Sequence, residues 1–117
     1  MRPVAQPRHR IGKHGAYIPK EHAIHAYKEA IKLRSISLQE QPLQGALKVT
    51  ITFSFNRSKS VKRKRPAVKP DIDNLVKAVL DACNGICYKD DAQVCEIYAK
   101  KQYGDDYTEV QISEISI

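Results

Sequence analysis

The stretch with the clearest capacity for chemistry is P-D-I-D-N-L-V-K, residues 70–77, and a second acidic pair, Asp90-Asp91, follows it. Inside a regular helix, Asp71 and Asp73 would point about 200° apart, because each residue advances about 100°. However, Lys69 precedes a proline and is pushed toward extended backbone, so we expect the chain to enter a helix at about Asp71. At this N-cap position the carboxylate of Asp71 can turn toward that of Asp73.

Lys77 follows Asp73 by one helical turn, and Asp81 continues the same polar stripe. In phosphodiester hydrolysis, carboxylates hold Mg²⁺, and the ion lowers the pKa of a bound water and stabilises the leaving oxygen. A nearby lysine steadies the negative charge that builds on the phosphate. The sequence therefore contains every residue type that a metal-dependent phosphodiesterase needs.

Each of these acids also has a common structural interpretation. Asp71 alone is typical of a helix cap, Asp73 and Lys77 can form an exposed ion pair, and Asp90-Asp91 can form a plain turn. A bare D-x-D pair is a weak motif. A further pair, Asp105-Asp106, follows Gly104, and we assign it to a turn because no lysine lies at helical spacing. The coincidence of the earlier acids with a basic segment favours chemistry.

The net charge of +7 is distributed unevenly along the chain. Residues 1–69 hold 16 Lys and Arg against 3 Asp and Glu, whereas residues 70–117 hold 4 against 10. Basic residues suit phosphate contacts, but a block of carboxylates in a nucleic-acid binder requires neutralisation, which a divalent cation supplies. The pattern predicts that binding and chemistry are carried by different segments.

Two segments supply the basic side chains. Residues 1–19 read as an irregular basic arm interrupted by proline and glycine, and residues 56–69 as a basic loop without acids, mobile when DNA is absent. The K-R-K-R-P run in this loop could equally be a nuclear-import signal or an RNA-binding patch. The side chains that we expect to contact DNA are Arg8, Arg10, Lys59, Lys62, Arg63, Lys64, Arg65 and Lys69.

Hydrophobic periodicity indicates the elements that position these residues. Apolar residues at helical spacing predict helices over residues 20–35 and 71–84, the second ended by Asn84-Gly85. Alternation predicts strands over residues 46–55, 94–102 and 107–115, with residues 104–106 as the hairpin turn between the last two. We therefore expect one α+β domain over residues 1–117, a small, mostly antiparallel sheet with two helices packed on one face.

Composition excludes several other classes of protein. The three cysteines, Cys83, Cys87 and Cys95, form no C-x-x-C pair and are predicted to be small buried thiols in the reduced state. No stretch approaches the roughly 20 apolar residues of a membrane span, and the N-terminus lacks a signal-peptide pattern. A soluble, cytoplasmic protein without membrane contact is expected.

The pattern K-P-D-I-D-N-L-x-K, the helix ending in Asp81-Ala82 and the block Y-K-D-D-A-Q-V resemble the RusA family of Holliday-junction resolvases. The proline- and arginine-rich start of the chain is similar to the family's entry segment. One departure is that family members often begin with a short apolar strand, whereas Met1 is followed here directly by Arg2-Pro3.

The resemblance implies a homodimeric crossover-junction endodeoxyribonuclease that makes paired, symmetric nicks across four-way or other branched DNA during recombination and repair. It implies Mg²⁺ as cofactor, with Mn²⁺ as an alternative ion. The family's essential acids fall on Asp71, Asp73 and Asp91, with Asp90 adjacent as a further metal ligand, and its essential lysine falls on Lys77. Two other hypotheses stay open: a non-catalytic DNA- or RNA-binding module with structural acids, and a general nuclease without junction preference.

Overall fold

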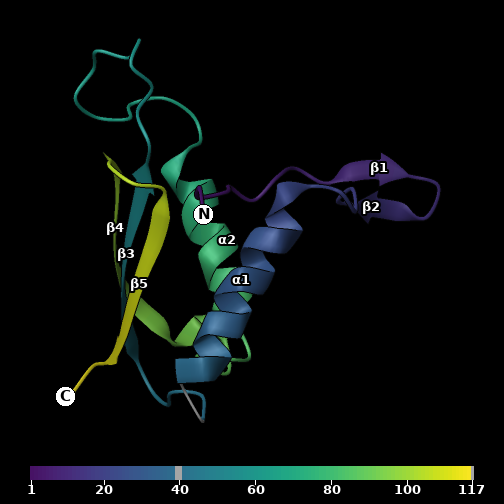
Figure 1. Cartoon of the computed structure of the whole chain (residues 1–117). Coiled ribbons are helices and arrows are strands. Elements are labelled where there is room, and N and C mark those ends of the chain that lie inside the picture. Colours follow the sequence, from purple (N-terminus) through teal and green to yellow (C-terminus); the bar gives the residue numbers. More distant parts are fainter. Residues whose placement is uncertain (39–40, 117) are drawn as a thin grey trace.

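The computed structural model describes residues 1–38 and 41–116. A three-stranded sheet has two helices on one of its faces, and a separate two-stranded hairpin extends away from them (Figure 1). In chain order the elements are β1 (Arg10–Gly12), β2 (Gly15–Tyr17), α1 (Ala23–Leu38), β3 (Leu47–Phe55), α2 (Ile72–Cys83), the 3₁₀ turn η1 (Asp91–Gln93), β4 (Val94–Tyr103) and β5 (Tyr107–Glu114). The predicted α+β architecture is confirmed.

The central strand β3 forms the middle of the core. Its alternating apolar residues are all buried, as the sequence predicted, and they are Leu47, Val49, Ile51, Phe53 and Phe55. They pack against Leu75, Val79 and Cys83 of α2. Burial of each large apolar side chain contributes about 1.5–3 kcal/mol relative to exposure. This packing fixes α2, and with it the acids at its beginning, relative to the sheet.

The strand order β4-β3-β5 differs from the predicted arrangement of the last two strands. β4 runs parallel to β3, with α2 as the crossover, while β5 is antiparallel on the other side of β3. The predicted hairpin between β4 and β5 is therefore wrong, because β3 separates them. Of the three strand pairings, β1–β2 and β3–β5 are antiparallel.

The connection from β4 to β5 crosses closely over the end of β3. The backbone N–H of Gly104 donates a 3.0 Å hydrogen bond to the carbonyl oxygen of Phe55. A Cβ atom at Gly104 would lie 2.8 Å from the Ser54 hydroxyl oxygen, closer than side-chain atoms approach. A larger residue at position 104 would therefore have to displace the buried Ser54 side chain.

Helix α1 is displaced toward the C-terminus relative to the predicted range of residues 20–35. It begins after His22, whose Nδ1 accepts a 3.0 Å hydrogen bond from the backbone N–H of Ile24 and so acts as a cap. It continues past Ser35, whose hydroxyl donates to the Ile31 carbonyl at 2.7 Å within the helix. Ile24 and Tyr27 pack against Ala78 of α2.

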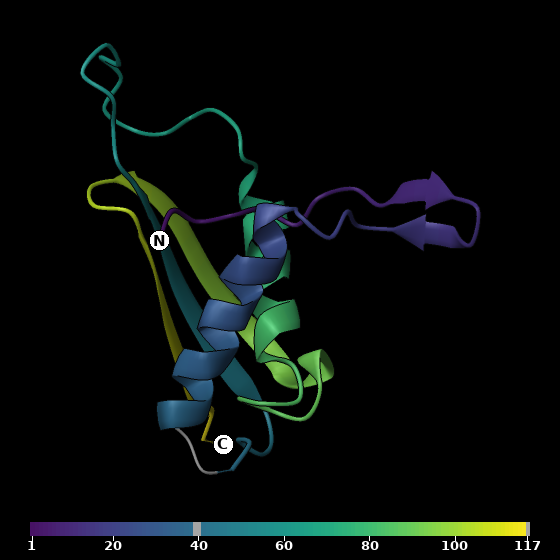
Figure 2. The same ribbon diagram turned by 45° about the vertical axis from the view of Figure 1, so that its right-hand side comes forward.

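Part of the N-terminal arm is ordered differently from the prediction. Residues 10–17, predicted to be irregular, form the β1–β2 hairpin, which projects from the body (Figure 2). Gly15 has φ +103°, which closes the turn in a conformation that other residues rarely adopt. The strands are only three residues long and fully exposed, so no hydrophobic alternation marks them. Residues 1–9 form no strand.

The cysteines divide into two groups. Cys83 and Cys87 are buried as predicted, and a side-chain hydrogen bond to Cys87, followed by burial, raises the pKa of Cys83 above its usual value. Cys95 is exposed, so its predicted burial is wrong. It lies at the β-bulge where β4 first pairs with Leu47 and Lys48 of β3, at the edge of the sheet.

Candidate active site

The beginning of α2 presents two carboxylates to solvent. Asp71 is the N-cap, with extended backbone angles of φ −70° and ψ 141°, as predicted. Its side chain makes no capping hydrogen bond within the part of the chain that the structure describes. Oδ1 of Asp73 accepts a 2.9 Å hydrogen bond from the backbone N–H of Asn74. The Asp71 carboxylate is thus not used to close the helix, and both acids lie at the positive end of the helix dipole.

Lys77 lies one turn beyond Asp73 on the exposed side of α2. The third member of the predicted polar stripe, Asp81, instead pairs with Lys28 of α1 at 3.5 Å. Among residues 1–38 and 41–116, Lys77 forms no ion pair with an acid. Lys77 is therefore available to a phosphate, whereas Asp81 has a structural role.

The two acids before β4 have different surroundings. Oδ1 of Asp90 accepts a 2.9 Å hydrogen bond from the backbone N–H of Ala92, and Oε1 of Gln93 accepts one of 3.0 Å from the backbone N–H of Asp90. This is a capping box around η1, in which the Asp90 carboxylate caps the first backbone N–H groups of the turn. Asp90 thus has a local structural function that Asp91 lacks.

Asp91 is oriented by a buried tyrosine. The Tyr88 hydroxyl lies 2.7 Å from Oδ1 of Asp91 and 3.0 Å from the carbonyl oxygen of Leu80 in α2. Burial first, and then the hydrogen bond to Asp91, raise the pKa of Tyr88 above its usual value. The phenol therefore keeps its proton at neutral pH and holds the carboxylate. This tether is the kind of outer contact that orients a metal ligand.

The same tether places Asp91 far from Asp71 within one chain. Leu80 follows Asp71 by nine residues, which corresponds to about 13 Å along a helix axis. Figure 1 shows this separation, with the start of α2 at one end of the molecule and the segment before β4 at the other. Among the described residues, no group of three His, Cys, Asp or Glu side chains could hold a metal. One chain brings Asp71, Asp73 and Lys77 together, and Asp90 and Asp91 lie apart from them.

Basic segments converge on the same end of α2 as Asp71. The backbone N–H of Gln6 donates a 2.9 Å hydrogen bond to the carbonyl oxygen of Asn74, which places the arm beside the helix start just before Arg8. Arg10 lies further out, on β1. The basic loop, residues 56–69, joins β3 directly to this helix and carries Lys59, Lys62, Arg63, Lys64, Arg65 and Lys69, all of them exposed.

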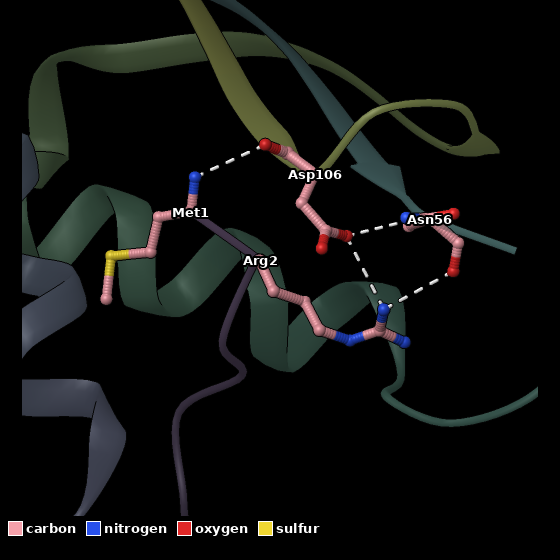
Figure 3. A network of polar contacts seen from close by, with 4 residues as sticks. All are labelled: Met1, Arg2, Asn56 and Asp106. Atoms are coloured by element: carbon pink, nitrogen blue, oxygen red, sulfur yellow. Dashed lines mark hydrogen bonds and ion pairs between the residues drawn. The ribbon is translucent and has the colours of Figure 1, made fainter. Parts of the chain in front are cut away.

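In the rival acidic pair, Asp106 has a structural role, although not in the hairpin turn that was predicted. Oδ1 of Asp106 accepts hydrogen bonds from the backbone N–H of Asn56, at 2.8 Å, and from the Arg2 guanidinium, at 3.4 Å (Figure 3). The backbone nitrogen of Met1 also donates to the Asp106 carbonyl oxygen. Asp106 thus joins the start of the chain to the end of β3.

Sequence reasoning missed three residues next to these groups. Tyr88 was read only as part of a motif, although a tyrosine three residues before an acid could have indicated a tether. Lys101 and Tyr103 lie at the end of β4 and reach the basic loop: Nζ of Lys101 donates to the carbonyl oxygens of Val68 and Pro70, at 2.7 and 3.0 Å. Their proximity follows from the parallel pairing of β3 with β4, which the sequence does not reveal.

Comparison with known proteins identifies the family of the chain. A family model described as "Endodeoxyribonuclease RusA" matches residues 1–113. The chain belongs to the RusA family. The family model is named for an endodeoxyribonuclease, RusA.

A bacterial protein is similar to part of this chain. The chain is 44% identical over 70 residues to "Uncharacterized protein YqaN" of Bacillus subtilis (strain 168). The match covers 54% of this chain and 49% of YqaN, about half of that relative.

Within the described residues, no helix combines the length and apolar character that crossing a membrane requires.

Proposed function

We propose that this RusA-family chain is a metal-dependent endonuclease that resolves four-way DNA junctions by paired, symmetric nicks, in DNA recombination and repair. One observation carries the proposal: two exposed carboxylates and a lysine begin the helix into which an acid-free basic loop leads directly. The loop suits the phosphate backbone, and the acids suit a divalent cation beside it.

The donor set fits Mg²⁺, a hard cation that prefers carboxylate oxygens, and it also fits Mn²⁺. Asp71 and Asp73 are the ligands at the helix start, with Asp91 as the third and Asp90 beside it. When bound, the ion supplies a more acidic water and charge stabilisation at the leaving oxygen. Asp71 and Asp73 would hold the ion near the scissile phosphate, and Lys77 would face the charge that develops there.

A two-fold symmetric homodimer reconciles this ligand set with the separation of the acids. Carboxylate ligands lie about 2.0–2.6 Å from Mg²⁺ or Ca²⁺, so Asp91 cannot reach an ion at Asp71 across the length of α2. A two-fold axis perpendicular to α2 places the partner's helix antiparallel to it. If the two helices pack side by side, the partner subunit's Asp91 comes to lie beside Asp71 and Asp73. The dimer has two such sites, which suits two opposed strands of one junction.

The competing function is a non-catalytic DNA- or RNA-binding module. It is favoured by the observation that one chain, over the described residues, gathers no three acidic groups around a metal position. Divalent metal distinguishes the two functions. We expect a synthetic four-way junction to be bound without metal and cut when Mg²⁺ or Mn²⁺ is added. A junction that stays bound and intact across a wide range of both ions would establish the binding module.

Substitution of Lys77 by alanine is expected to lower turnover about 10²-fold, as does loss of one group that stabilises transition-state charge. Junction affinity should change little, because the interaction is made mainly when charge develops. Single-turnover cleavage and gel-shift affinity measure the two effects separately. Lys100→Ala, an exposed lysine on β4, is the matched control for loss of one positive charge. An equal loss of affinity in Lys77→Ala would make Lys77 an ordinary phosphate contact.

Neutralising Lys62, Arg63, Lys64 and Arg65 together by glutamine is expected to weaken junction binding and flatten its salt dependence. The log–log slope of affinity against salt should fall by about 0.9 for each phosphate contact that is lost. Cleavage should fall mainly through affinity. The measurement is junction affinity at several salt concentrations for wild type and variant. Parallel lines would show that these side chains make no phosphate contacts, and Arg8 and Arg10 would then be the better candidates.

A further inference from the structure

A small pocket lies between the basic loop and the ends of β3 and β4. Its volume is about 200 Å³. The residues that matter to its chemistry are Phe55, Arg57, Arg63, Pro70, Lys101 and Tyr103. Sites for drug-sized ligands have roughly 300–1,000 Å³, so this pocket suits a smaller group, such as the base of one nucleotide.

The pocket combines an aromatic face with cations. The guanidinium carbon of Arg57 lies 5.8 Å from the centre of the Tyr103 ring, and that of Arg63 lies 6.0 Å from it. Nε of Arg63 also donates a 2.8 Å hydrogen bond to the Tyr103 hydroxyl. The two arginines thus lie against an aromatic ring, an arrangement that also binds a flat base and its phosphate.

The positive charges of Arg57 and Arg63 in the pocket are not neutralised by an acid of the described residues. Over the described part of the chain, the ion pairs are Arg2–Asp106 and Lys28–Asp81. Arg57 and Arg63 therefore have no carboxylate partner there, and the Arg57 guanidinium donates only to the carbonyl oxygen of Arg63, at 3.2 Å. Two guanidiniums that lack acids favour a ligand that brings its own negative charge.

The position of the pocket connects it with the candidate active site. Lys101 holds the carbonyl oxygens of Val68 and Pro70, and Pro70 immediately precedes Asp71. A nucleotide in the pocket would therefore belong to the strand whose neighbouring phosphate lies at Asp71. Unstacking a base is least costly where it is already unpaired, as at the branch point of a junction.

We propose that this pocket binds one unstacked nucleotide of the DNA strand, whose base replaces a guanidinium on the Tyr103 ring and whose phosphate binds Arg57 and Arg63. Because a strand reaches the pocket only if DNA lies along the start of α2, this site rests on the function proposed above. It deepens that function by giving the enzyme a contact with unpaired bases, which linear duplex does not offer.

The absence of tryptophan from the sequence provides a direct test. In Tyr103→Trp, the one indole reports on the pocket. We expect a five-nucleotide single-stranded DNA, added with EDTA so that no metal is present, to quench its fluorescence by stacking. Tyr98→Trp, on the same strand at a position 62% exposed, is the matched control and should not be quenched. Equal quenching in the two variants overturns the proposal.

Inorganic pyrophosphate tests whether the pocket recognises only charge. It carries phosphate groups but no base, so it should leave the Tyr103→Trp emission nearly unchanged. Quenching by pyrophosphate equal to that by the oligonucleotide would show an anion site without base stacking and overturn the proposal.

Tyr103→Leu provides a second measurement if the tryptophan variant does not fold. Affinity for the same oligonucleotide, measured by fluorescence anisotropy without metal, should fall about 10- to 100-fold relative to Tyr98→Leu. Unchanged affinity overturns the pocket. If the chain resolves junctions but its binding does not depend on Tyr103, the proposed function stands and this site is overturned. If binding depends on Tyr103 but the chain cuts no DNA, this site stands and the proposed function is overturned.

Discussion

Replacing Asp71 by asparagine is expected to abolish DNA cleavage and to leave junction binding intact or stronger, and Asp73→Asn should do the same. A bound metal supplies several kcal/mol of transition-state stabilisation, and about 1.4 kcal/mol corresponds to tenfold in rate, so cleavage should fall at least about 10²-fold. Binding is preserved because a negative charge that faces phosphate is removed. Cleavage and gel-shift assays on one four-way junction measure the two effects.

The fold should tolerate these substitutions. Asparagine caps helices as well as aspartate does, and the Asp71 side chain makes no capping bond to any described residue. At position 73, an asparagine carbonyl oxygen can still accept the N–H of Asn74. Asp81→Asn, on the same helix, is the matched control; it loses only a partly exposed ion pair with Lys28 and should cut normally. Wild-type cleavage by Asp71→Asn and Asp73→Asn would remove these acids from the site.

Mixing two inactive variants is expected to restore cleavage if the partner subunit completes each site. Asp71→Asn and Asp91→Asn should each be inactive alone. In a mixed dimer, one site combines both substitutions, and the other combines the intact Asp71 of one subunit with the intact Asp91 of its partner. Because half of the randomly paired dimers are mixed and each has one intact site, nicking should recover to about a quarter of the wild-type rate.

The matched control for this experiment is a mixture of Asp71→Asn with Asp73→Asn. Those two acids lie on the same helix turn, so every site in the mixed dimer lacks one of them, and no recovery is expected. Recovery in neither mixture would place Asp91 in the same site as Asp71 within one chain, or outside the site altogether. A site that joins Asp71 and Asp91 of one chain would require a rearrangement of α2 that this structure does not show.

Hydrophobic periodicity predicted the elements that are strongly buried on one face. β3 and α2 were found because alternation in one, and helical spacing in the other, reflect the core between them. The position of Asp71 as an extended N-cap also followed from local rules, since the preceding Lys69-Pro70 disfavours helix. Local stereochemistry was therefore enough to place the candidate ligands at the start of α2.

Features that depend on long-range pairing could not be predicted from local patterns. Alternation indicates that β4 and β5 are strands, but it does not tell that β3 lies between them. The distinct roles of Asp90 and Asp91 depend on Gln93 and Tyr88, whose side chains are oriented only by the folded turn. Whether these acids and Asp71 serve one site depends on assembly, which the pattern of one chain does not encode.

Cleavage of a synthetic four-way junction, with each strand labelled in turn, tests the central claim most directly. With Mg²⁺ present, we expect two nicks at symmetric positions in opposed strands, giving nicked duplexes that DNA ligase can seal, while a linear duplex of the same sequence is cut far more slowly. A linear duplex cut as readily as the junction, with nicks at unrelated positions, would contradict junction resolution and indicate a general nuclease.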